Sequence, residues 1–169
     1  MWDRYPQRDF AQGNFSDCCI GLGRTNGRVI ADYLLNLSLN MIEIFDNIEN
    51  KTIGNALCFF AKDENDELIF IIDNIEIHPK YKPSEKVSKN LKSAIKEYAQ
   101  NYLRETTGRD DISIYLGANN NDVVKADTFI SKNIKFLGEL NCNDIYLDVY
   151  NGWIKTKNLS KEVNLEKLD

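Results

Sequence analysis

The stretch that decides the fold is Leu68-Ile-Phe-Ile-Ile-Asp-Asn-Ile-Glu-Ile-His-Pro79, followed by a long amphipathic segment that runs to Gly108. Its apolar run, Leu68–Ile72, is short and consists of Leu, Ile and Phe, which favours a buried strand over a helix. The strand is expected to end at His78-Pro79, because proline restricts the residue before it and offers no donor to a neighbouring strand. The sequence therefore predicts a central strand that leads into a long helix.

That helix is predicted to run from about Ser84 to Thr107. Ser84 is a favourable N-cap, and Glu85 in the first turn complements the helix dipole. Apolar residues then recur at spacings of three and four, which places them on one side of the helix: Val87, Leu91, Ala94, Ile95, Tyr98, Tyr102 and Leu103. Gly108 can adopt the left-handed conformation that commonly ends a helix.

Simple alternation along the central strand gives it two different faces. One face would consist of Ile69, Ile71, Asp73, Ile75 and Ile77. The other would consist of Phe70, Ile72, Asn74, Glu76 and His78. The second face carries three polar side chains beside the helix start, where open sheets flanked by helices often bind ligands. The same three residues would also be expected if the strand simply reached solvent there, so both interpretations stay open.

Size and composition predict a single domain with a substantial core, since the chain has 169 residues of which 43% are hydrophobic. No apolar run is long enough to cross a membrane, and the first residues lack the apolar segment of a signal peptide. These features predict a cytoplasmic protein without a membrane partner, or a piece of a larger protein.

Charge and cysteine usage narrow the function classes. A net charge of −5 and a pI near 5.0 argue against general nucleic-acid binding, which needs a basic face. The four cysteines lack the paired spacing of a zinc module and are too few for a disulfide framework. Free thiols and no metal are expected.

The segments before the central strand predict an irregular arm over residues 1–16, a short strand over 17–22 and a helix over about 26–40. Alternating segments at 42–46 and 52–62 predict two further strands. Together with the central strand they would form a three-strand antiparallel meander.

The second half of the chain predicts, in order, a strand, a short helix and a two-strand hairpin over residues 112–116, 123–130, 135–140 and 144–150. The tail from Lys155 is charged and sparsely apolar, and is expected to dock as one turn or to stay mobile. The single domain is therefore predicted to span residues 17–154.

This order of elements resembles the GNAT superfamily of acyl-CoA-dependent N-acetyltransferases over about residues 40–150. Three local stretches agree with it: Thr52-Ile-Gly54, Ile75-Glu-Ile-His-Pro-Lys-Tyr81 and residues 129–136. The resemblance implies a mixed α/β (α+β) fold with a sheet of six to seven strands, a three-strand meander and two to three flanking helices. It also implies that the fourth and fifth strands part to hold acetyl-CoA, with its pyrophosphate at the start of the long helix.

The resemblance further implies two sets of functional residues. The acetyl-CoA set consists of Ile75, Ile77, Lys82, Ser84, Lys86, Asn119 and Asn120, although the two asparagines are equally typical of a turn. The catalytic set is Glu76, as the base that deprotonates an acceptor amine, with His78 as the other candidate. The acceptor would be a small-molecule amine or a protein amine.

Departures from the family pattern fall on functional positions. Glu85 and Val87 stand where the family's phosphate loop has glycines, and Phe129 stands where the family has a tyrosine acid. Side chains and a negative charge at the loop predict weak acetyl-CoA binding. An active but slow transferase and a non-catalytic interaction module with the same fold are therefore both open.

A different chemistry is suggested near the N-terminus. Gln12 and Cys18 have the spacing of the nucleophile segment of papain-like cysteine peptidases, which this segment resembles. A thiolate nucleophile needs a histidine partner, and His78 is the only histidine in the chain. The peptidase is an alternative function, whereas ordinary packing of Cys18 and Cys19 on a strand is the simpler interpretation.

Overall fold

The computed structural model describes residues 38–81, 85–118, 128–137, 145–154 and 160–168, together with Asn14, Tyr33, Asn36 and Val124. Its elements are β1 (Leu39–Asp46), β2 (Lys51–Lys62), β3 (Leu68–Ile77), η1 (Pro79–Tyr81), α3 (Glu85–Thr107), β4 (Ser113–Gly117), β5 (Ile130–Phe136), β6 (Ile145–Leu147), β7 (Gly152–Ile154) and β8 (Ser160–Lys167).

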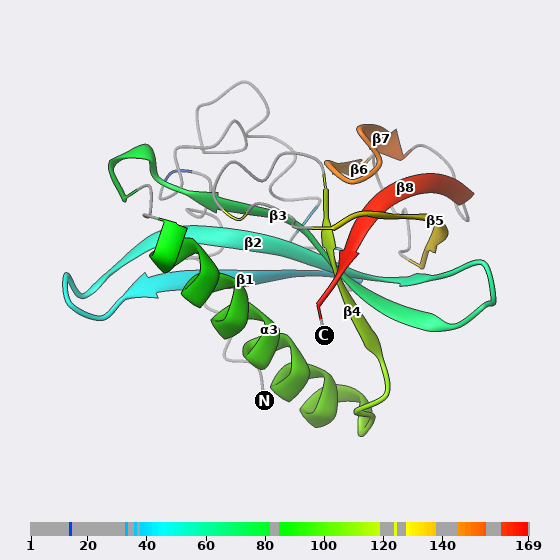
Figure 1. Cartoon of the computed structure of the whole chain (residues 1–169), viewed down its shortest axis with the longest axis horizontal. Helices are drawn as coiled ribbons and strands as arrows, with labels where there is room; N and C mark the ends of the chain where they lie inside the picture. The colour runs from blue at the N-terminus through cyan, green and yellow to red at the C-terminus, as the bar shows by residue number, and fades with distance from the viewer. Residues whose placement is uncertain are drawn as a thin grey trace.

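Six strands form one mixed sheet in the order β1-β2-β3-β4-β8-β5 (Figure 1). The first three are an antiparallel meander, β3 and β4 are parallel, and β8 lies antiparallel between β4 and β5. β2 also pairs with β5, through Ala61 with Phe136 and Lys62 with Lys135. The strands β2, β3, β4, β8 and β5 therefore close into a ring, and β1 extends the sheet outside it.

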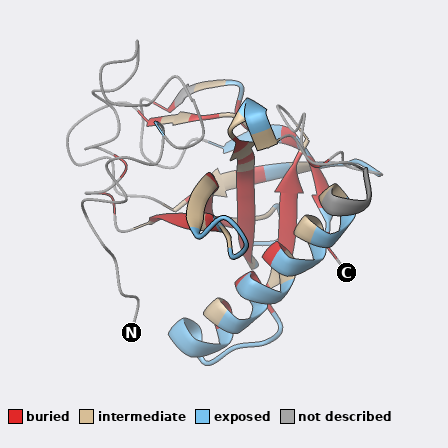
Figure 2. Ribbon diagram, turned by 90° about the vertical axis from the view of Figure 1, so that its left-hand side faces the viewer, coloured by how far each residue is buried: buried red, intermediate tan, exposed pale blue. Residues whose placement is uncertain are grey.

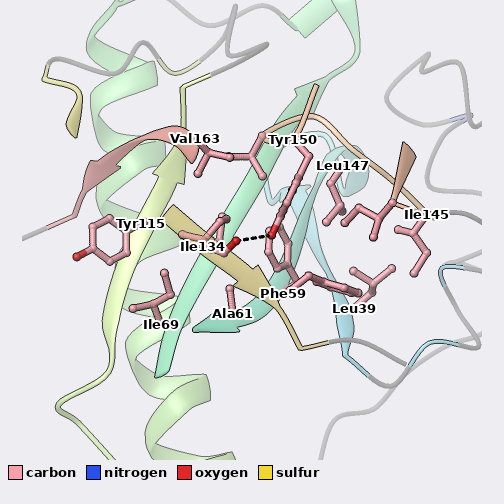
Figure 3. Packing of buried hydrophobic residues seen from close by; sticks show 14 of the residues in the cluster. Leu39, Phe59, Ala61, Ile69, Tyr115, Ile134, Ile145, Leu147, Tyr150 and Val163 are labelled. Atoms are coloured by element: carbon pink, nitrogen blue, oxygen red, sulfur yellow. Dashed lines mark hydrogen bonds between the residues drawn. The ribbon is translucent and has the colours of Figure 1, made fainter. Parts of the chain in front are cut away.

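The inside of the ring is filled by apolar side chains, and all five of its strands contribute (Figure 3). These residues are Phe59, Ala61, Ile69, Ile71, Tyr115, Ile134, Phe136, Val163 and Leu165. Phe59 and Phe136 pack edge to face, with ring centroids 5.4 Å apart. The hydroxyl of Tyr150 donates to the Ile134 carbonyl at 3.2 Å, which satisfies the polar end of a buried aromatic side chain.

α3 covers the other face of the sheet, with its exposed side outward and buried strand residues beneath it (Figure 2). Its residues Ile95, Ala99 and Leu103 are almost fully buried, as the helical spacing predicts. Tyr102 packs against Phe70 of β3, with ring centroids 5.7 Å apart. The sheet therefore has two apolar faces, one inside the ring and one under the helix.

A β-bulge interrupts β3 at Asp73. Ile72 pairs with Cys58 of β2 and Asn74 pairs with Leu57, so Asp73 has no partner residue in the register. The extra residue reverses the alternation beyond it. The prediction that Ile75 and Ile77 share a face with Ile69 and Ile71 is therefore wrong. Ile69 and Ile71 lie inside the ring, whereas Ile75 and Ile77 lie under α3.

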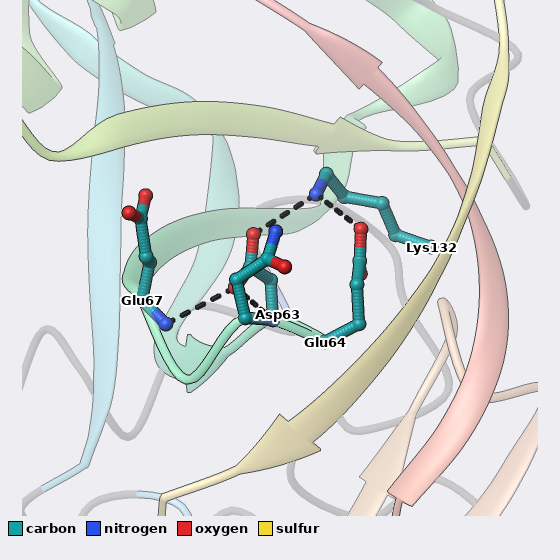
Figure 4. Close-up of polar contacts among 5 residues, drawn as sticks. Asp63, Glu64, Glu67 and Lys132 are labelled. Carbon is teal, nitrogen blue, oxygen red and sulfur yellow. Dashed lines mark hydrogen bonds and ion pairs between the residues drawn. The ribbon is translucent and has the colours of Figure 1, made fainter.

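An ion pair lies at the end of the ring next to the β2–β3 turn (Figure 4). Lys132 of β5 contacts Asp63 and Glu64 at 3.0 Å each, and the Lys132 and Asp63 side chains are only 13% and 7% exposed. Burial opposes the charged form, but the hydrogen bonds to Glu64 and Asp63 outweigh it and raise the pKa of Lys132 to about 12. The Lys132 ammonium also lies over the Tyr115 ring, 5.8 Å from its centroid.

The α+β class, the meander and the long helix are confirmed. Among the described elements a single α-helix, α3, flanks the sheet, which is fewer than the two to three that were predicted. Tyr33 is helical, within the helix predicted over 26–40, but Leu39 and Asn40 already belong to β1. Apolar residues on both faces of a buried strand can be mistaken for the end of a helical stripe.

Three predictions for the second half of the chain are wrong. Ile130 begins β5 rather than ending a short helix. The segments 135–140 and 144–150 were predicted to pair with each other, but β5 pairs with β8 and β2, and β6 pairs with β7. The tail is neither one turn nor mobile over Ser160–Lys167, because these residues form β8. Its first three residues are exposed and polar, so only its second half carries a strand pattern.

Candidate functional site

The candidate site begins at the bulge in β3, where Asp73 is 1% exposed. Its two carboxylate oxygens accept hydrogen bonds from the backbone N–H groups of Asp148 and Val149, at 2.8 and 2.7 Å. These donors follow β6 in the chain, 75 and 76 positions from Asp73. The bulge therefore fixes the backbone after β6 against the strand that carries Glu76.

Asn74 joins two further carboxylates. Its amide nitrogen donates to Glu76 Oε1 at 3.1 Å and to Asp148 Oδ2 at 2.5 Å. Carboxylates accept but do not donate when ionised, so these two bonds fix which end of the amide is nitrogen. The oxygen, Asn74 Oδ1, therefore points away from both carboxylates; it is buried and has no hydrogen-bond partner.

A row of three polar residues crosses the meander beside this cluster. Glu43 of β1 pairs with Asn55 of β2, and Asn55 pairs with Glu76 of β3. Directly paired residues of antiparallel strands present their side chains on the same face. The two glutamates are half-buried, whereas Asn55 is 3% exposed and its Oδ1 has no hydrogen-bond partner. The Thr52 hydroxyl donates to the Glu43 carboxylate.

Burial and negative neighbours perturb the titration of the site. Burial first, and then the charge of Asp148, raise the pKa of Asp73 to about 7, against the two backbone hydrogen bonds that lower it. The charge of Glu76 acts in the same direction as Asp148. A carboxyl with this pKa changes charge near neutral pH, which is typical of functional sites and also of buried structural acids.

The two predicted catalytic residues lie on the same strand end but differ in their contacts. Glu76 belongs to the cluster, next to Asn74 as predicted. His78 instead faces the η1 turn, where its Nδ1 accepts the Lys80 backbone N–H at 3.2 Å and its ring packs edge to face on Tyr81. None of the hydrogen bonds described for His78 reaches Glu76.

The structure describes only some of the residues that were predicted to hold acetyl-CoA. The side chains of Ile75 and Ile77 are buried under α3, so only their backbone could face a ligand. Lys82, Ser84, Asn119 and Asn120 lie outside the described residues, as do Gln12, Cys18 and Cys19 of the peptidase alternative. Lys86 lies in α3, but its side chain is outside the described part.

Because Phe129 replaces the family's tyrosine acid, Tyr115 and Tyr146 are the remaining candidates for the proton donor. Phe129, at the family's tyrosine position, is 56% exposed. Tyr115 is buried inside the ring beside Lys132, and Tyr146 is half-buried on β6. None of the hydrogen bonds described for the tyrosine hydroxyls reaches Glu76.

The pairing of the parallel strands β3 and β4 stops next to this cluster. They pair from Ile69 with Ser113 to Ile72 with Leu116, and β3 then continues to Ile77 without β4. At Gly117 the two backbones still touch, since a Cβ there would lie 2.6 Å from the Asp73 carbonyl oxygen. β4 ends at Gly117, and β3 continues beyond the bulge without it.

Sequence reasoning missed Asp148, Asn55 and Glu43. The pairing of Glu43 with Asn55 and of Asn55 with Glu76 follows from two hairpin registers, which turn positions alone do not fix. Asp148 reaches Asn74 through a long-range contact between β6 and β3, for which the sequence carries no local signal.

No protein-family model, curated protein or solved structure matches this chain. In the described ranges no helix is both long and apolar enough to cross a membrane. The same ranges contain no group of three or more His, Cys, Asp or Glu side chains arranged to hold a metal ion.

Proposed function

We propose that this chain is a GNAT-like acyltransferase domain that transfers an acetyl group from acetyl-CoA to an amine. The observation that carries the proposal is the parallel pair β3 and β4, whose pairing stops at Ile72 and Leu116 while β3 continues with Asn74 and Glu76. An antiparallel meander on one side and a long helix after β3 complete the arrangement that the resemblance implies.

The place where β4 ends beside β3 supports the binding of acetyl-CoA there. Because β4 ends at Gly117, residues 74–77 of β3 are not paired with β4. The buried side chains of Ile75 and Ile77 hold this backbone against α3. Acetyl-CoA would supply an acetyl group activated as a thioester.

Glu76 is the proposed base. It is half-buried and accepts a hydrogen bond from Asn74, which orients its carboxylate. Its carboxylate would take a proton from the acceptor nitrogen, because an ammonium has no lone pair with which to attack. The nitrogen then forms a bond to the acetyl carbon as the carbon–sulfur bond breaks, and the sulfur leaves as a thiolate. The second proton that the nitrogen loses on becoming an amide passes through water to this thiolate.

The test has a binding arm and a turnover arm. Isothermal titration with acetyl-CoA should detect binding to the full chain, and CoA release should be measured with a panel of amines as acceptors. Glu76→Gln should lower turnover by roughly 100-fold while leaving acetyl-CoA binding unchanged. Glu97→Gln, an exposed carboxylate on α3, is the matched control and should behave like the parent.

Two results would contradict the proposal. If millimolar acetyl-CoA does not bind, the chain is a non-catalytic interaction module of similar fold. If acetyl transfer survives Glu76→Gln and is lost in His78→Ala, the base is His78.

A further inference from the structure

A cavity of about 230 Å³ lies where the end of β8 meets α3. It is lined by residues of these two elements and by the residue after β8: Lys92, Ser93, Lys96, Glu166, Lys167 and Leu168. Leu165 of β8 lies inside the ring, and successive side chains of a strand point to opposite faces. Glu166 therefore points to the α3 face of the sheet, where it forms an ion pair with Lys92.

The Glu166 carboxylate is only half satisfied. The residue is 5% exposed, and its Oε1 accepts a hydrogen bond from the Lys92 ammonium at 2.5 Å. Its Oε2 is buried and has no hydrogen-bond partner. A buried carboxylate oxygen without a donor costs folding free energy, so such atoms are rare unless a bound molecule satisfies them. Since Glu166 lines the cavity, a molecule in the cavity can supply that donor.

The charges around Glu166 favour a neutral donor over a second cation. Lys92 already pairs with the Glu166 carboxylate, and the Lys96 ammonium belongs to the same cavity lining. An ammonium group bound at Oε2 would be repelled by Lys96, whereas a hydroxyl group would donate its hydrogen without this repulsion.

Lys96 favours a negative charge elsewhere on the same molecule. Its side chain is half-buried beside the cavity, and no described residue forms a hydrogen bond or an ion pair with it. Lys96 follows Lys92 by four positions, which places both on the same side of α3. A carboxylate bound in the cavity would give the Lys96 ammonium a partner of opposite charge.

We propose that the cavity between α3 and β8 binds a small hydroxy acid, whose hydroxyl group donates to Glu166 Oε2 and whose carboxylate pairs with Lys96. The cavity volume is below the roughly 300–1,000 Å³ of sites for drug-sized ligands, so the ligand is small. The site is separate from the proposed acetyl transfer. Glu76 faces the other side of the sheet, because its neighbours Ile75 and Ile77 lie under α3.

Binding is measured on the full chain by NMR titration, which follows the amide signals of Ser93, Lys96 and Leu168. The probes are lactate, which has a hydroxyl group next to its carboxylate, and propionate, which lacks only that hydroxyl group. Propionate should bind roughly 10-fold more weakly than lactate, because it loses a hydrogen bond to a charged acceptor. Propane-1,2-diol lacks the carboxylate and should also bind roughly 10-fold more weakly than lactate.

Two variants separate the two contacts. Glu166→Gln removes the charged acceptor and should reduce the preference for lactate over propionate to less than about 3-fold. Lys96→Met should weaken the binding of both acids roughly 10-fold and leave that preference unchanged, since both acids carry the carboxylate. Lys80→Met, on the exposed η1 turn, is the control and should change neither affinity.

Thermal unfolding shows whether Glu166→Gln is folded, and Lys96→Met tests the site at a half-buried position if it is not. Equal affinity for lactate and propionate in the parent would mean that Glu166 Oε2 is simply hydrated. If lactate at millimolar concentration shifts none of the amide signals, or if Lys96→Met binds it like the parent, the cavity is not a hydroxy-acid site. Each of these results would overturn the proposal without bearing on acetyl transfer.

Discussion

Asp73 and Val149 are 76 positions apart, and the carboxylate of the first accepts the backbone N–H of the second at 2.7 Å. The contact is possible because the bulge removes Asp73 from the pairing register of β3. One buried side chain thus joins the central strand to the segment after β6.

Asp73 should make stability depend on pH. Its pKa is raised from 3.8 to about 7, by burial first and then by Asp148, so the folded chain keeps a proton that the unfolded chain has released. The stabilisation is complete below the unfolded pKa and is lost as pH rises through about 7. The urea midpoint should therefore be lower at pH 8 than at pH 5, and this fall should shrink in Asp73→Asn.

The control for this prediction is Asp110→Asn, which changes an exposed carboxylate and should keep the parent's pH dependence. A parent midpoint that is constant between pH 5 and 8 would show that Asp73 does not titrate in this range.

The Lys132 ion pair should contribute more to the free energy of unfolding than a surface ion pair from the same hairpin does. Lys132→Met leaves the nearly buried Asp63 carboxylate without its cation, and should lower the free energy of unfolding by about 2 kcal/mol. Lys62→Met breaks a pair to Asp66, whose side chain is 77% exposed, and should cost less than about 0.5 kcal/mol. If urea unfolding shows the same loss of unfolding free energy in both variants, burial does not decide how much these ion pairs contribute.

Gly117 should not tolerate a side chain. A Cβ at this position would lie 2.6 Å from the Asp73 carbonyl oxygen and 3.4 Å from Val149 Cβ, and the first of these neighbours is backbone. Gly117→Ala should therefore destabilise the fold by about 1–3 kcal/mol. Gly152→Ala is the control, since its nearest neighbour would be 3.9 Å away, and its unfolding temperature should match the parent's.

β8 should be as important to stability as any central strand. Leu165 is fully buried inside the ring. Leu165→Ala should therefore lower the free energy of unfolding, measured in urea, by about 2–5 kcal/mol. The adjacent Asn164 side chain is exposed, and Asn164→Ala should change stability by less than about 0.5 kcal/mol. A small effect of Leu165→Ala would mean that the segment is the loosely attached tail that its composition suggests.

Local signals account for the parts of the fold that sequence predicted. The meander and α3 carry strong apolar periodicity and clear ends, and both form as expected. The bulge at Asp73 has no such signal, because Ile75 and Ile77 look the same whichever face they occupy. β8 was missed since only Val163 and Leu165 alternate as apolar residues, between polar neighbours.

The candidate site was predictable only along one strand. Asn74 and Glu76 were expected to share a face, and they do, because the bulge precedes both of them. His78 was expected beside them, but its hydrogen bond to the residue after Pro79 turns it toward η1. Asn55 and Asp148 come to Glu76 and Asn74 through strand register and a distant contact, which depend on the whole sheet.

Ring closure has a consequence for the order in which the protein is made. β8 lies between β4 and β5, so the ring stays open until residues through Lys167 have left the ribosome. Until then, β4 and β5 each expose an unpaired edge and the apolar inner surface, which are the features that promote aggregation of a nascent chain. The meander and α3 are complete sixty residues earlier, and would have to stay soluble as an open sheet while the ribosome finishes the strand that seals it.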